Sequence, residues 1–175
     1  MSVLADQQGW VGESGELDAK FGEPVVTFPR LRQEVRDGVT DAFLWEYFMT
    51  KPFVDSKELA FAGTVSAPWP AFMVAARSMF ARDNASKLRD LLQVIAEGTR
   101  IFKQEREASI ARVSASFGIQ LADAAEWFEN IHYSDTGSIS SDSLRETVAA
   151  LKKARVLTQE CDVNQLVDTA VAIVE

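Results

Sequence analysis

The chain has 175 residues, 47% of them hydrophobic and 25% charged, which is enough for one good hydrophobic core. Its net charge of −8 argues against binding to nucleic acids or to anionic membrane surfaces, because both require a basic protein surface. No apolar run approaches the roughly 20 residues of a membrane span, so membrane insertion is not expected.

Cysteine and histidine each occur once, as Cys161 and His132. A single cysteine forms no intrachain disulfide, and the pair cannot supply a zinc site built from several such ligands. No Gly-x-Ser-x-Gly turn accompanies His132, which argues against a serine-hydrolase triad. We therefore predict no catalytic residue, no metal site and no cofactor. Cys161 is expected to be a structural thiol, and His132 to have a structural or surface role.

The first eighty residues mix short strand-like runs with turns. Residues 3–8 have the pattern of a short helix that Gly9 stops, and glycines mark a turn-rich loop over residues 12–22. Pro68-Trp69-Pro70 reads as a rigid turn. The strand candidates 59–65 and 71–76 lie on either side of this turn.

A parallel β-α-β unit is predicted over residues 24–44. Residues 24–28 and 39–44 read as short buried strands, and residues 30–37 between them have a polar helical pattern that Gly38 ends. A strand, a helix and a second strand in this order are typical of a parallel sheet.

Beyond residue 84 the apolar residues recur at helical spacing, on one face of each segment. Gly118 is expected to stop one of these helices, serines that end the polar loop 133–141 to cap another, and Asp162 to cap the last. The predicted apolar stripes cover residues 88–102, 110–117, 121–128, 144–151 and 166–174. The sequence therefore predicts an α/β protein with a helix-rich C-terminal half.

Aromatic residues around one carboxylate make residues 40–53 the strongest candidate for a binding site. Glu46 suits hydrogen bonds from a ligand amine or amide, or else the dipole at the first turn of a helix. Trp45 and Trp69 are candidate stacking walls, with packing in the protein core as the alternative. Phe43 is expected to pack in the protein core, although it is also a ligand-binding candidate.

Two groups of charged residues are expected to have ordinary structural roles. Asp123 and Glu126 lie three residues apart on a predicted helix, and without a nearby histidine they are expected to form a solvated face. Lys152, Lys153 and Arg155 lie at the end of a predicted helix, where positive charge suits the dipole.

The run Thr40-Asp41-Ala42-Phe43 into Trp45-Glu46, followed by Ala67-Pro68-Trp69-Pro70, resembles the type II periplasmic-binding-protein-like family. The similar branch includes nitrate-, sulfonate- and thiamine-pyrimidine-type binders, and an intracellular fungal subgroup is closest. The resemblance extends over roughly residues 1–155. It implies part of a two-lobed α/β fold: residues 1–65 are a portion of the second lobe with the hinge crossover, and residues 66–175 return to the first lobe.

The resemblance implies non-catalytic binding of a small-molecule solute, with Phe43, Trp45, Glu46, Ser66 and Trp69 as ligand-binding residues and a hinge near Thr40 and Ser66. Family members are far longer than this chain, so a C-terminal fragment, a truncated gene model or a separately encoded half is expected. Such a fragment would lack an independent ligand function and would self-associate. Another alternative is part of a thiamine-pyrimidine-synthase-like enzyme, although its cysteine-rich loop is absent. The N-terminus has no secretory signal, which favours a cytoplasmic protein.

Overall fold

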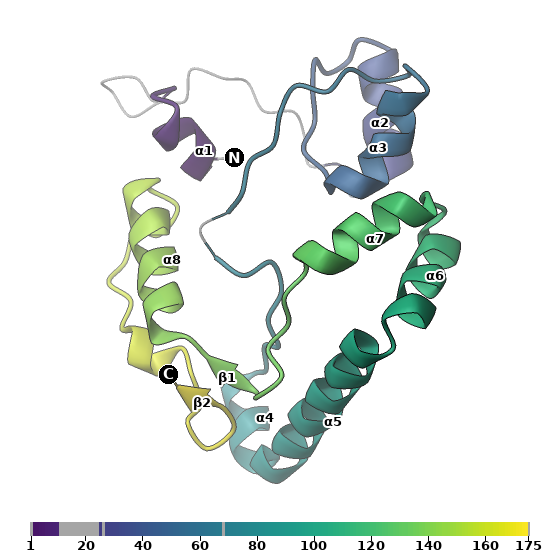
Figure 1. Cartoon of the computed structure of the whole chain (residues 1–175). Helices are drawn as coiled ribbons and strands as arrows, with labels where there is room; N and C mark the ends of the chain where they lie inside the picture. Colours follow the sequence, from purple (N-terminus) through teal and green to yellow (C-terminus); the bar gives the residue numbers. More distant parts are fainter. Residues whose placement is uncertain (1, 11–24, 26, 68, 175) are drawn as a thin grey trace. The chain divides into compact units, whose positions relative to one another are not determined.

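The computed structural model describes residues 2–10, 25, 27–67 and 69–174 (Figure 1). These residues are helix-rich and divide into two compact units. Unit 1 consists of Met1–Gly9, Val65–Ser109 and Asn130–Glu175, and unit 2 of Trp10–Thr64 and Ile110–Glu129. The chain first passes from unit 2 to unit 1 between Thr64 and Val65.

Unit 2 begins its described helices with α2, Phe28–Arg36. Pro29 lies in the first turn, where its missing N–H has no helical partner to lose and its fixed φ suits the helix. The C-terminal end is the predicted one, since Gly38 follows at a φ of +68°. The strand predicted before this helix is wrong. Phe28 was expected to end that strand but begins α2, and Val25 and Thr27 belong to no strand. Pro24 and Val26 lie outside the described residues.

The predicted strand 39–44 is also wrong, because these residues form an irregular segment. Val39 is 68% exposed and Leu44 53% exposed, so the segment is not the buried strand that its apolar residues suggested. Within the described part of residues 24–44, the predicted helix is therefore present, but the two strands of the predicted β-α-β unit are not. A helix satisfies its own backbone hydrogen bonds, whereas a strand needs a neighbour.

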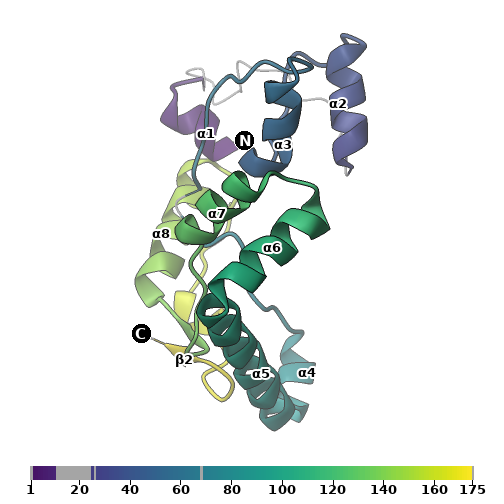
Figure 2. The same ribbon diagram turned by 45° about the vertical axis from the view of Figure 1, so that its right-hand side comes forward.

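Helix α3, Tyr47–Asp55, follows this segment and lies beside α2 in both ribbon views (Figures 1 and 2). Two predicted helices, α6 (Arg106–Phe117) and α7 (Leu121–Asn130), are confirmed, and most of each belongs to unit 2. Gly118 separates them with a φ of +66°, which a glycine adopts without strain. The buried residues of this part of unit 2 are Ile110, Val113, Ile119, Asp123, Ala124 and Phe128.

Unit 1 is built on α5, Ala85–Gln104, the longest helix and a confirmed prediction. Helix α1, Ser2–Gln7, packs against α8, Ser141–Lys153, and the Lys153 ammonium lies 2.6 Å from the Asp6 carboxylate. The serine cap predicted for α8 is Ser140, whose hydroxyl oxygen accepts a hydrogen bond from the Ser143 N–H. The short helix α4, Ser78–Asp83, precedes α5.

The C-terminal segment differs from the prediction of a helix over residues 162–174. Asp162 does cap a helical turn, but that turn is a 3₁₀ helix confined to Val163–Gln165. The chain then forms β2, Ile173–Val174, which pairs in parallel with β1, Ser138–Ile139. Ser138 is opposite Ile173, and Ile139 is opposite Val174.

This two-stranded pair is the one sheet among the described residues. The strand candidates 59–65 and 71–76 are wrong, because their residues take irregular conformations and are mostly exposed. The observed architecture is thus helix-rich, and the sheet of the expected two-lobed α/β fold is not formed by the described residues.

Candidate functional site

An aromatic cluster of Phe28, Phe43, Trp45 and Phe53 lies in unit 2. The Phe28 ring is its centre: Trp45 stacks on it at 5.4 Å with an interplanar angle of 16°. Phe43 and Phe53 meet the same ring edge-on at 6.0 and 5.5 Å. Such pairs contribute about 0.5–1.5 kcal/mol each beyond the area they bury. The cluster therefore joins α2, the segment before α3, and α3 itself.

Arg32 adds an electrostatic connection across the cluster. Its guanidinium lies 3.3 Å from the centre of the Phe53 ring and 5.7 Å from that of Phe28. The same group donates hydrogen bonds to both carboxylate oxygens of Glu58, at 2.6 Å each from Nη2. Its side chain is 18% exposed and that of Glu58 is 23%, so the pair is better shielded than a surface salt bridge. Arg32 thereby fixes the C-terminal side of α3 to α2.

Trp45 is packed on one side and open on another. The residue is 45% exposed although one ring face covers Phe28. Tyr47, two residues later, is 38% exposed and contacts Phe48 at 4.9 Å and Phe61 at 5.6 Å. The packing of Trp45 on Phe28 agrees with its interpretation as a core residue, and its role as a stacking wall for a ligand stays a prediction.

Glu46 is exposed at the N-terminal end of α3, which agrees with its alternative interpretation as a solvated carboxylate at the start of a helix, and its side chain also caps that helix. Its Oε2 accepts a hydrogen bond of 2.7 Å from the backbone N–H of Met49, and its carbonyl oxygen accepts from the Thr50 hydroxyl at 2.8 Å. The carboxylate is exposed, and within the described residues its Oε1 accepts no hydrogen bond. One oxygen therefore orients the side chain while the other stays available to a donor.

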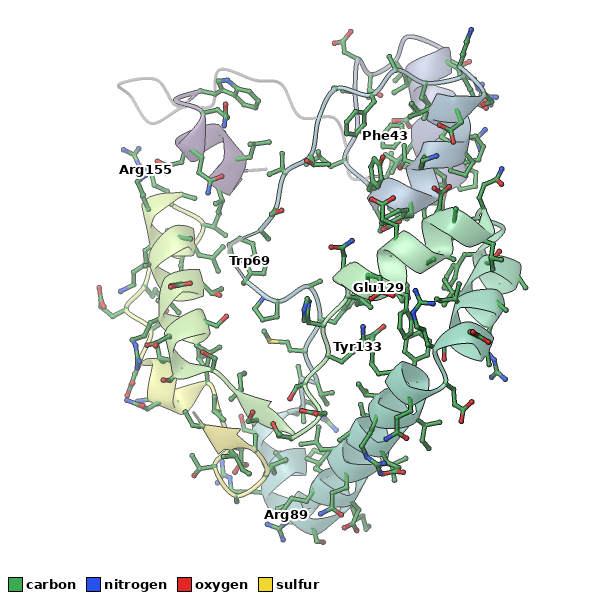
Figure 3. The ribbon with its side chains drawn as sticks, viewed as in Figure 1. Phe43, Trp69, Arg89, Glu129, Tyr133 and Arg155 are labelled. Atoms are coloured by element: carbon green, nitrogen blue, oxygen red, sulfur yellow. The ribbon has the colours of Figure 1, made fainter. Side chains whose placement is uncertain are left out.

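The structure brings Phe43, Trp45 and Glu46 together in unit 2, whereas Ser66 and Trp69 belong to unit 1. Ser66 is exposed, and Trp69 is half-buried on the irregular segment that precedes α4 (Figure 3). Phe43 is half-buried within the cluster, in keeping with its expected place in the core.

The expectation that Asp123 lies on a solvated face is wrong, because the residue is buried and only 6% exposed. Its Oδ1 lies 3.4 Å from the Lys51 ammonium, which also donates to Asp55 at 2.6 Å. The Oδ2 atom is buried without a hydrogen-bond partner. The hydrogen bond with Asp55 is the main cause that raises the pKa of Lys51 above 10.5, and desolvation opposes it. A sequence signal existed, since Asp123 is next to the buried stripe of Ala124 and Phe128.

Two shallow hollows that were not predicted from the sequence lie along α5 in unit 1. Their volumes are about 340 and 290 Å³, and they share Arg100 and Asp135. The first also includes the exposed His132, whose Nδ1 is 3.1 Å from the Asn130 carbonyl oxygen. Burial raises the pKa of Tyr133, which lies near the far end of α5 from Arg89 (Figure 3). Side chains of both charges line these hollows, so they select no one class of ion.

Comparison with known families bears on the first part of the chain. Residues 1–65 match the model of the Ca3427-like PBP family. This is a type II periplasmic-binding-protein-like family, so the resemblance seen in the sequence is confirmed over these residues. The match includes Phe43, Trp45 and Glu46 and ends before Ser66 and Trp69. No match was found among curated proteins or among solved structures.

The described residues contain neither a membrane-spanning helix nor a cluster of metal ligands. None of their helices has both the length and the apolar character needed to cross a membrane. No cluster of three or more histidine, cysteine, aspartate and glutamate side chains is arranged there to hold a metal ion. The aromatic cluster and the adjacent Glu46 carboxylate lie within the residues that match the family model.

Proposed function

We propose that this chain binds a small-molecule solute without catalysis, as part of a two-lobed type II periplasmic-binding-protein-like module. The observation that supports the proposal is the family match over residues 1–65, which includes the predicted ligand residues Phe43, Trp45 and Glu46. The geometry adds that Trp45 is partly exposed beside a carboxylate with one oxygen available. Ser66 and Trp69 lie beyond the match and remain separate ligand-binding candidates.

The chemistry at Trp45 and Glu46 favours a flat ligand that carries an amine or amide N–H. A planar ring stacks on the open part of the Trp45 indole, a contact of about 0.5–1.5 kcal/mol. An N–H group that donates to Glu46 Oε1 forms a hydrogen bond to a charged acceptor, with a net contribution of about 1.5–3 kcal/mol. The carboxylate contact is the larger of the two, so we expect an amine to bind more tightly than the same ring without one.

Thermal unfolding of the full chain with a panel of planar amines and their ring analogues without N–H groups tests this proposal. A ligand that binds the folded state at 100 times its Kd stabilises the protein by about 2.7 kcal/mol, which raises Tm measurably. Glu46→Gln keeps an oxygen that can accept the Met49 N–H but removes the charge. We expect this variant to fold normally and to bind a protonated amine at least about tenfold more weakly.

Three further variants separate the candidate residues. Trp45→Phe keeps a ring to pack on Phe28 while reducing the exposed stacking surface, so a weaker Tm shift is expected. Trp69→Ala and Ser66→Ala test the two candidates outside the family match. If no compound in the panel raises Tm, the proposal is wrong. If a shift occurs but is the same in Glu46→Gln and Trp45→Phe as in the original chain, binding lies elsewhere.

A further inference from the structure

The longest uncharged stretch of the chain runs from Leu59 to Ala76, between Glu58 and Arg77. Its last part is the irregular segment before α4, and every residue from Ala71 to Phe80 is exposed. Phe72 is 94% exposed, more than any other large hydrophobic residue of the described chain. Large exposed apolar patches of this kind mark interaction sites in soluble proteins.

The segment Phe72–Ala76 also has an open backbone. Within the described residues, none of its N–H or C=O groups hydrogen-bonds to another protein group. The sequence Phe-Met-Val-Ala-Ala has the apolar and β-branched composition that predicts a strand. An exposed, apolar strand sequence with unpaired backbone groups is suited to pairing with a strand from another chain.

The charges limit what such a partner can be. A partner strand that carried charged side chains would find no opposite charge between Leu59 and Ala76, and would have to bury its own charges unpaired. The rest of the chain is acidic, with a net charge of −8, so an acidic surface would be repelled as well. An apolar, uncharged strand fits, and a second copy of the same segment is such a strand.

The exposed area is of the size that a dimer needs. Phe72, Met73, Val74, Met79 and Phe80 are 94%, 58%, 57%, 74% and 45% exposed. With about 200 Å² for a fully exposed side chain of this size, they present roughly 650 Å² on one chain. A standard interface buries about 800 Å² on each partner, so complete burial of these side chains together with the paired backbone would reach the usual range.

One antiparallel register also gives complementary shapes. In a two-fold pair with Val74 opposite its own copy, Met73 is opposite Ala75 and Phe72 is opposite Ala76. Each large side chain then has a small one beside it on the same face. A parallel, in-register pair would instead place Phe72 beside its own copy. A two-fold axis at Met73 would put Phe72 against the branched Val74.

We infer that Phe72–Ala76 forms an antiparallel β-pair with the same segment of a second copy. The two-fold axis passes between the two copies of Val74, which lie opposite each other. Met79 and Phe80 on α4 extend the apolar contact. This inference goes beyond solute binding and does not depend on it, because none of these residues belongs to the predicted ligand site.

Sedimentation equilibrium of the full chain tests the dimer. We expect a concentration-dependent rise from 19.4 kDa to twice that mass and no further, since a two-fold contact closes on itself. Phe72→Asp should raise the dissociation constant about a hundredfold or more, because the pair would bury a carboxylate. The matched control is Val39→Asp in unit 2, at a residue that is also largely exposed, at 68%. This control should leave the dimer unchanged.

Cysteine cross-linking tests the register, in a Cys161→Ser background that removes the native thiol. Val74→Cys should form a disulfide-linked dimer under mild oxidation, since residues directly opposite in an antiparallel pair have Cβ atoms about 5 Å apart. Ala76→Cys should not, because the two copies of residue 76 would lie about 13 Å apart along the strands.

Four results would overturn the inference. The chain could stay monomeric at all concentrations, assemble beyond the dimer, or dimerise equally well with Phe72→Asp. Cross-linking of Ala76→Cys that matches or exceeds that of Val74→Cys would show that the strands pair in another register. Far-UV circular dichroism checks that each variant is folded. This is expected because residues 39, 72, 74 and 76 are exposed, and because Cys161→Ser is a change of similar size at a half-buried residue.

Discussion

Residues 28–59 and residues 60–76 are both rich in aromatic and aliphatic side chains, but the two regions differ in how these side chains are packed. In the first region Phe28, Phe43, Trp45 and Phe53 pack on one another, with Arg32 against two of the rings. In the second, Phe72 is almost fully exposed. Apolar composition alone therefore does not decide whether a segment of this chain is buried.

Backbone hydrogen bonding explains the difference. The first region contains α2 and α3, and each helix satisfies most of its own N–H and C=O groups. Phe28 and Phe53, which lie on these helices, can then pack without further hydrogen-bonding partners, and Phe43 and Trp45 on the irregular segment between the helices pack against Phe28. The second region has the composition of strands, and a strand must find a neighbour before its backbone can be buried.

The largest effect is expected when the packed region loses its central ring. Phe28→Ala removes the ring that Phe43, Trp45 and Phe53 contact, and should cost about 2 kcal/mol of unfolding free energy because Phe28 is half-buried. Urea unfolding followed by circular dichroism measures this cost. Val39→Ala, at a residue 68% exposed, is the control and should change the free energy by less than about 0.5 kcal/mol.

A smaller effect is expected at the ion pair between α3 and α7. Lys51→Met leaves the buried Asp123 without its cation and should destabilise unit 2. The pKa of Lys51 is raised above 10.5 in the folded protein, chiefly by the hydrogen bond with Asp55. Its contribution is thus complete below about pH 10.5 and is lost as the pH rises through the higher folded-state pKa.

Urea unfolding of the original chain and of Lys51→Met, at neutral and strongly alkaline pH, measures this contribution. We expect the difference between the two to shrink at the alkaline end. Lys57→Met is the control, because Lys57 is exposed and makes no ion pair within the described residues. A difference that stays constant from neutral pH to above the folded-state pKa would contradict the role given to the Lys51 charge.

The cap of α3 is expected to have a modest effect on stability. Glu46→Ala removes the acceptor for the Met49 N–H and should cost about 1 kcal/mol. Glu46→Gln keeps an acceptor and should cost less. If both variants unfold at the same urea concentration as the original chain, the hydrogen bond contributes nothing to stability. Comparison of these two variants also separates the capping role of Glu46 from its proposed ligand contact.

The smallest effect is expected in the exposed region. Phe72→Ala is the same chemical change as Phe28→Ala, but at low protein concentration it should alter the unfolding free energy by less than about 0.5 kcal/mol. The reason is that the Phe72 side chain is already in water in the single chain. A cost similar to that of Phe28→Ala would show that Phe72 is packed within its own chain.

The sequence predicted helices far better than strands. Gly38, Gly118 and Ser140 mark helix ends where the structure has them, because caps and stops act through neighbouring residues. Asp162 also caps a turn, but nothing continues it as a helix. The strands expected over 39–44, 59–65 and 71–76 depend on partners distant in the chain, and the described residues do not supply them.

The candidate site shows the same division. Trp45 and Glu46 were predicted from the sequence as ligand-binding candidates because a carboxylate beside aromatics is a local signal, and the family match includes both residues. The contact of Trp45 with Phe28 was not predicted, since it depends on how α2 and α3 pack. The burial of Asp123 beside Lys51 was missed for the same reason.

By itself the sequence determined the helical pattern of α2 and of most of the C-terminal half, the helix ends at Gly38, Gly118 and Ser140, and the family resemblance of residues 1–65. These features follow from interactions between residues a few positions apart, or from the order of residues along the chain. Only the tertiary structure decided which aromatic rings are packed, which carboxylate is buried and which apolar segment stays exposed. Those outcomes depend on contacts between distant segments, and the free energy of such contacts is set by the burial and hydrogen bonding of both partners together.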